Sequence, residues 1–114
     1  STRSRVTLMN KYEVIEKQSY NKVVGLIKQV EEKHWFFNIG VVRSNIRKIK
    51  KSLSILEVGA TLNCESEEEL DKVQMRAAQL QGRLKGYNEI LQYCKRNGVQ
   101  SEIDWLRGRS PRIN

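Results

Sequence analysis

Proline, cysteine and long apolar runs are scarce in this chain of 114 residues, and each scarcity excludes a class of protein. One proline and seven glycines exclude a collagen-like or proline-rich chain. Two cysteines are too few for a framework of several disulfides. No apolar run approaches the roughly 18 residues of a membrane span, and residues 1–5 lack the apolar core of a secretory signal. We therefore expect one small, soluble domain that does not cross a membrane.

Positive charge is in excess. The chain has 21 lysines and arginines against 13 acids, which gives a formal net charge of +8. Most of the surplus lies in residues 1–60, and no acid occurs between Glu32 and Glu57. The densest basic group falls in that gap and consists of Arg43, Arg47, Lys48, Lys50 and Lys51. A basic group of this kind indicates a polyanionic partner such as nucleic acid.

Apolar residues at heptad spacing predict long helices. The clearest series is Leu70, Val73, Ala77, Leu80, Leu84, Tyr87, Leu91 and Cys94. It predicts a helix over 67–96, which begins at a capping box of Ser66 with Glu69 and ends at Asn97. Gly82 and Gly86 fall inside this helix but off the apolar series. They are either tolerated surface glycines or a strip where a neighbouring backbone approaches closely.

Three further helices are expected. A second heptad series comprises Trp35, Ile39, Val42, Ile46, Ile49, Leu53 and Leu56. It predicts a helix over about 41–57 with a stop at Gly59, although residues 38–40 could form a turn or belong to a longer helix. A looser series predicts a helix over 9–34. Acidic residues after Ser101 indicate a short helix over 102–107.

The expected fold is therefore all-α, either an elongated antiparallel helical hairpin or a three-helix bundle with coiled-coil-like packing. We expect one helical domain over 9–106, between a flexible basic N-terminus (1–8) and a disordered basic tail (107–114). A long hairpin buries little core for its length, so a homo-oligomer is expected. The residues expected to contact a second copy or another partner are Trp35, Phe36, Phe37, Leu70, Leu80, Leu84, Tyr87 and Leu91.

The basic group has two competing interpretations. A hairpin with a connection over 58–66 would bring it beside the acidic residues 67–71, which could neutralise it. Alternatively, it faces nucleic acid or an acidic protein, together with the tail arginines Arg107, Arg109 and Arg112.

The consecutive aromatics Trp35, Phe36 and Phe37 cannot all lie on one helix face. They are expected to form core or oligomer contacts. The alternatives are an interface hot spot or, because basic residues follow them, a helix lying on a membrane surface.

No arrangement of residues indicates catalysis, a metal site or a cofactor. His34 is the only histidine, no four zinc ligands have suitable spacing, and no phosphate-binding glycine loop occurs. We expect His34 to pack at a helix end. Cys64 and Cys94 would lie about 40 Å apart along the predicted helix, too far for a disulfide, which indicates a reducing compartment such as the cytoplasm. Cys94 is expected in the core.

The segment 80–91, LQGRLKGYNEIL, resembles a stretch on a long helix in small helical proteins of tailed bacteriophages. That resemblance implies an accessory or virion role, with a place in the host cytoplasm or the virion, and it implies no active site. The leading hypothesis is a non-enzymatic helical assembly or adaptor protein with a basic face. The alternatives are a nucleic-acid-binding module that contacts phosphates and a small inhibitor of a host factor.

Overall fold

The computed structural model describes residues 10–63 and 65–97, and within these ranges every regular element is an α-helix. The helices are α2 (Lys11–Lys33), α3 (Ile39–Asn63) and α4 (Glu67–Asn97). The expected all-α class is confirmed, and the arrangement is a three-helix bundle. The expected termini 1–8 and 107–114 and the expected short helix 102–107 lie outside the described residues.

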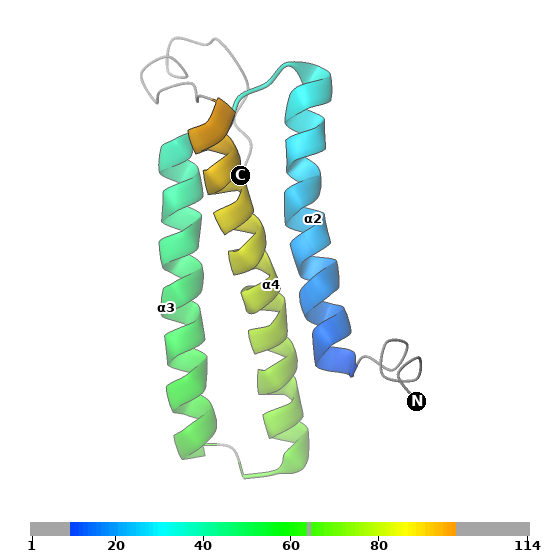
Figure 1. The fold of residues 1–114 in the computed structure, drawn as a ribbon. Helices are drawn as coiled ribbons and strands as arrows, with labels where there is room; N and C mark the ends of the chain where they lie inside the picture. The colour runs from blue at the N-terminus through cyan, green and yellow to red at the C-terminus, as the bar shows by residue number, and fades with distance from the viewer. Residues whose placement is uncertain (1–9, 64, 98–114) are drawn as a thin grey trace.

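The central helix of the bundle is α4, with α2 packed on one side and α3 on the other (Figure 1). The chain runs up through α2, down through α3 and up again through α4, so α2 and α4 are parallel and α3 is antiparallel to both (Figure 1). Residues 34–38 connect α2 to α3 across one end of the bundle. Because α4 lies between two helices, two of its faces must be suited to packing.

Each helix begins at a residue whose side chain accepts a hydrogen bond from a backbone N–H in the first turn. The side chain of Asn10 accepts from the N–H of Glu13 (2.9 Å), and that of Asn38 accepts from the N–H of Val41 (3.2 Å). The Ser66 hydroxyl accepts from the N–H of Glu69 (3.2 Å), as the capping box predicts. Residues 38–40 therefore start α3 rather than break it.

Helix α2 ends at His34, which adopts the left-handed conformation (φ 56°) and donates its backbone N–H to the carbonyl of Val30. The expected position of His34 at a helix end is confirmed, but the expected packing is wrong, because the residue is exposed and caps the helix through its backbone. Trp35 lies in the connection after it and not in a helix. The second heptad series therefore begins at Ile39.

The expected stop at Gly59 is wrong, because α3 continues through it to Asn63. A helical glycine costs only about 1 kcal/mol relative to alanine, and residues 60–63 contain no proline that would break the helix. The connection to α4 is therefore residues 64–66 rather than 58–66. This six-residue extension carries the end of α3 about 9 Å further than expected.

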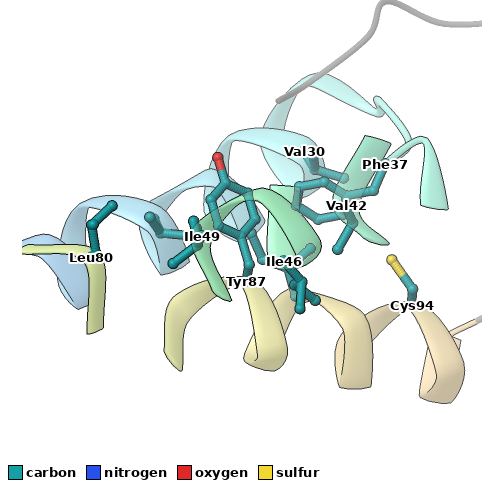
Figure 2. Close-up of a cluster of buried hydrophobic side chains, with 10 residues drawn as sticks. Val30, Phe37, Val42, Ile46, Ile49, Leu80, Tyr87 and Cys94 are labelled. Carbon is teal, nitrogen blue, oxygen red and sulfur yellow. The ribbon is translucent and has the colours of Figure 1, made fainter. Parts of the chain in front are cut away.

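The core gathers side chains from all three helices and from the connection between α2 and α3 (Figure 2). Its buried members are Val23, Val30, Phe37, Val42, Ile46, Ile49, Leu80, Tyr87, Ile90 and Cys94. Both heptad series contribute, so they pack against each other within one chain. The expected core position of Cys94 is confirmed, and burial raises the pKa of its thiol to about 11.

A strip containing Gly82 and Gly86 forms the second packing face of α4 and lies against α2. A Cβ added to Gly82 would stand 2.8 Å from the Cβ of Ser19 and closer still to the backbone carbonyl of Glu16. One added to Gly86 would stand 2.6 Å from the Cβ of Val23. Of the two interpretations of these glycines, close backbone approach is the one observed.

Candidate nucleic-acid interface

The five basic residues Arg43, Arg47, Lys48, Lys50 and Lys51, hereafter the α3 basic cluster, all lie within α3 and are all exposed. Val42, Ile46 and Ile49 are interleaved with them and are buried in the core. Since the buried residues recur every three or four positions, they fix the rotation of α3 and turn the cationic side chains toward solvent. The sequence pattern thus places the charge on one outward surface.

Among the residues that the structure describes, no ion pair involves the α3 basic cluster. The ion pairs found there join Lys11 to Asp71 (2.6 Å), Lys28 to Glu32 (3.8 Å) and Lys85 to Glu16. Two of these three pairs connect α2 to α4 and so support the glycine contact between those helices. None of them reaches the outward surface of α3.

Of the two interpretations of the α3 basic cluster, direct pairing with the acidic start of α4 is not observed, because no ion pair joins the two groups among the described residues. Lys51 lies twelve residues, or about 18 Å by helix rise, before the end of α3 at Asn63, where the chain turns toward α4. Helix α4 then runs back alongside α3, and Asp71 lies four residues, or about 6 Å, along it, so Lys51 and Asp71 are offset by about 12 Å along the bundle. That offset is slightly more than the Debye length of about 10 Å at 0.1 M salt. The interpretation of neutralisation assumed that α3 ends at residue 57, which would have placed the two groups closer together.

Two of the acids at the start of α4, Glu69 and Asp71, have partners outside α3. Asp71 pairs with Lys11 and accepts a hydrogen bond from the Tyr12 hydroxyl, and these two contacts lower the pKa of its carboxyl. Glu69 accepts from the backbone N–H of Glu65 (3.2 Å) and caps the helix. The acidic first turn therefore caps the start of α4 and contributes to its contact with α2.

The three consecutive aromatics lie in the connection between α2 and α3, and only one of them is fully buried. Phe37 is buried and meets Tyr93 edge to face, with ring centroids 5.9 Å apart. Trp35 is half-buried beneath the ammonium of Lys33, which lies 4.5 Å from the ring centroid. Phe36 points outward and is exposed.

Most residues expected to mediate self-association are used inside the bundle. Leu80 and Tyr87 are buried, and Leu84 and Leu91 pack against the core. Leu70, with Phe36, remains exposed. Sequence analysis missed Ile55 and Val58, which are 62% and 60% exposed on α3. The sequence did contain a signal for them, because both are apolar residues that lie outside the heptad series of α3 and so are not needed for its core.

Within residues 10–63 and 65–97, no group of three or more histidines, cysteines or acids could hold a metal ion. No helix in the same part of the chain is long and apolar enough to cross a bilayer. The expected contacts by Arg107, Arg109 and Arg112, and the environment of Cys64, lie outside the described residues.

No family model, curated protein or solved structure matches the chain.

Proposed function

We propose that the chain is a non-enzymatic helical module that binds nucleic acid through the α3 basic cluster. The observation that supports this proposal is a set of five exposed cations within nine residues of one rigid helix, with no ion pair to any described residue. Duplex DNA carries one phosphate charge for about every 1.7 Å of its axis. A cationic stripe about 12 Å long from Arg43 to Lys51 can therefore face several phosphates at once.

Changing Arg47, Lys48, Lys50 and Lys51 together to glutamine should remove most of the affinity for a 20-base-pair duplex. Each phosphate contact contributes about −0.9 to the slope of log affinity against log salt concentration, so the slope should become less negative by about 3–4. Fluorescence anisotropy with a labelled duplex between 50 and 200 mM salt measures both quantities. The core residues are untouched, so the helical circular dichroism should stay the same.

The matched control changes four exposed cations elsewhere, namely Lys17, Lys72, Lys95 and Arg96, to glutamine. Both variants lower the net charge from +8 to +4. The control should keep a salt dependence close to that of the unmodified chain. Equal losses in the two variants would show that binding depends on net charge alone, and the α3 basic cluster would then have no particular role.

A second candidate function, assembly of copies of this chain, is favoured by the exposed pair Ile55 and Val58. Three residues apart on α3, they share one face and follow the α3 basic cluster. Exposed aliphatic side chains in adjacent positions are typical of protein–protein contacts. The proposal is therefore a homo-oligomer held by this face of α3, which extends the adaptor hypothesis.

Changing both Ile55 and Val58 to glutamate should convert the oligomer to a monomer, because two charges would have to be buried in the contact. Light scattering at increasing protein concentration measures the mass directly. Changing Val14 to glutamate, an exposed position on α2, is the control and should leave the mass unchanged. A strictly monomeric unmodified chain at millimolar concentration would refute assembly while leaving nucleic-acid binding open to its own test.

A further inference from the structure

A cleft of about 500 Å³ lies between α2 and α4, and cationic side chains from both helices line it. Lys22 comes from α2, and Arg76 and Arg83 come from α4. Among the described residues, no aspartate or glutamate lines the cleft, and none of its three cations takes part in an ion pair. No residue of the α3 basic cluster lines it, so this is a separate concentration of positive charge.

The close contact of α2 with α4 explains why these cations converge. At Gly82 the backbone of α2 comes so close that only a hydrogen atom fits, and at Gly86 the side chain of Val23 fills the same space. Arg83 and Tyr87 directly follow the two glycines in the chain and line the cleft beside this contact. Three like charges on neighbouring elements repel one another, and that repulsion is relieved when an anion occupies the space between them.

A buried tyrosine adds a neutral donor. Tyr87 lines the cleft and is only 5% exposed, yet its hydroxyl makes no hydrogen bond with any residue that the structure describes. Figure 2 shows the ring rising from α4 with the hydroxyl oxygen at its far end. Among the described residues, Asn38 Nδ2 is the one buried side-chain polar atom without a partner, so the Tyr87 hydroxyl is reached by solvent and is available to an occupant of the cleft.

Two further polar residues, Gln79 and Ser19, line the cleft beside its cations. Gln79 accepts a hydrogen bond from Nη1 of Arg76 (3.2 Å), which holds one face of that guanidinium and leaves its other donors available. Ser19 lines the cleft from the opposite side, on α2. Val23 and Leu26 supply an apolar part of the lining. The cleft thus combines two guanidinium groups, an ammonium and hydroxyl donors with a small apolar surface.

We propose that this cleft binds a small organic phosphate, with the phosphate held by Lys22, Arg76 and Arg83 and the carbon skeleton against Val23 and Leu26. Guanidinium groups donate paired hydrogen bonds that fit phosphate oxygens, and an ammonium adds a compact charge. The volume falls within the roughly 300–1,000 Å³ of small-molecule sites and exceeds what a bare phosphate needs. The apolar lining favours an organic phosphate over the inorganic ion.

The test uses ADP as the probe in isothermal titration calorimetry at low salt, with pyrophosphate as competitor and adenosine as the ligand without phosphate. The unmodified chain should bind ADP, pyrophosphate should displace it, and adenosine should bind at least about tenfold more weakly because the charge-assisted contacts are absent. Failure to bind ADP at millimolar concentration, failure of displacement, or equal binding of adenosine would each overturn the proposal.

Two variants of equal charge locate the site. Changing Lys22, Arg76 and Arg83 to glutamine should weaken ADP binding by about 100-fold or more, because three charge-assisted contacts are lost. Changing Arg43, Arg47 and Lys50 to glutamine removes the same charge from the α3 basic cluster and should leave ADP binding within about twofold. Equal weakening in both variants would assign the binding to general electrostatic attraction and overturn the proposal.

The change Tyr87→Phe keeps the buried ring and removes only the hydroxyl. It should weaken ADP binding by about three- to tenfold while leaving the thermal midpoint within a few degrees, since the hydroxyl has no described partner to lose. Unchanged ADP affinity would remove the hydroxyl from the site. If the triple variant unfolded, this variant and the pyrophosphate competition would still decide the question. The ADP result does not depend on the proposed function: if the chain failed to bind duplex DNA through the α3 basic cluster, ADP binding to the cleft would still be expected.

Discussion

The change Gly82→Ala should destabilise the chain by about 3 kcal/mol or more, at the upper end of the range for overpacked cores. The added methyl group would overlap the backbone carbonyl of Glu16, and a backbone atom in the middle of a helix cannot turn aside as a side chain can. The overlap can be relieved only by moving α2 away from α4. Such a movement would also separate Lys85 from Glu16 and Lys11 from Asp71. Urea unfolding followed by circular dichroism measures the loss.

A matched control is available on α2 itself. A methyl group added to Gly25 would meet nothing within 4 Å, so Gly25→Ala should stabilise the chain by about 0.5–1 kcal/mol through helix propensity. Gly86→Ala should fall between the two, because its nearest neighbour is the side chain of Val23 rather than backbone. If Gly82→Ala proved as stable as Gly25→Ala, the close packing of α2 on α4 would be refuted.

The contact between α3 and α4 was predictable because large apolar residues define it. Leu80, Tyr87 and Cys94 on α4 and Val42, Ile46 and Ile49 on α3 recur at the spacing that keeps one face of a helix buried. Their burial removes enough apolar surface from water to outweigh local helix preferences. The heptad series therefore identified this part of the core, although the buried Phe37 and Ile90 lie outside both series and Leu70 of the α4 series is exposed.

The contact between α2 and α4 was harder to predict because small residues define it. Gly82, Gly86 and the buried Ala78 carry little apolar surface, so they give no strong periodic signal. Their spacing of four residues was the only indication that a backbone would approach. Whether it did depended on the rotation of α2, which its looser apolar pattern does not fix.

Charge placement was the least predictable feature, because it depends on where helices end and how they rotate. Because α3 ends at Asn63 rather than at residue 57, its basic cluster lies further along the bundle from the acids at the start of α4, which were one of two alternatives for its partner. The cleft was not predicted at all. Lys22 and Arg83 lie more than sixty residues apart in the sequence. Neither belongs to a sequence pattern that indicates a site, and they line one cleft only because α2 packs against α4.

Truncating Ile90 to alanine should cost about 3–4 kcal/mol of unfolding free energy, within the range for buried isoleucine. Ile90 is fully buried, with no exposed surface. It lies one turn after Gly86, which faces α2, and three residues after Tyr87, which belongs to the series facing α3. Its side chain therefore occupies the part of α4 between the two packing faces, where a cavity cannot collapse without moving both neighbouring helices.

The change Ile55→Ala is the control for this truncation, because it removes the same atoms from an exposed position on α3. At a concentration where light scattering gives a monomer, it should change the unfolding free energy by less than about 0.5 kcal/mol, since little buried surface is lost and alanine is the better helix former. Thermal and urea unfolding of the two variants under identical conditions give the comparison. Equal effects would mean that Ile90 is not buried in solution. A large effect at Ile55 alone at higher concentration would instead show that the exposed face of α3 is covered by a second copy of the chain.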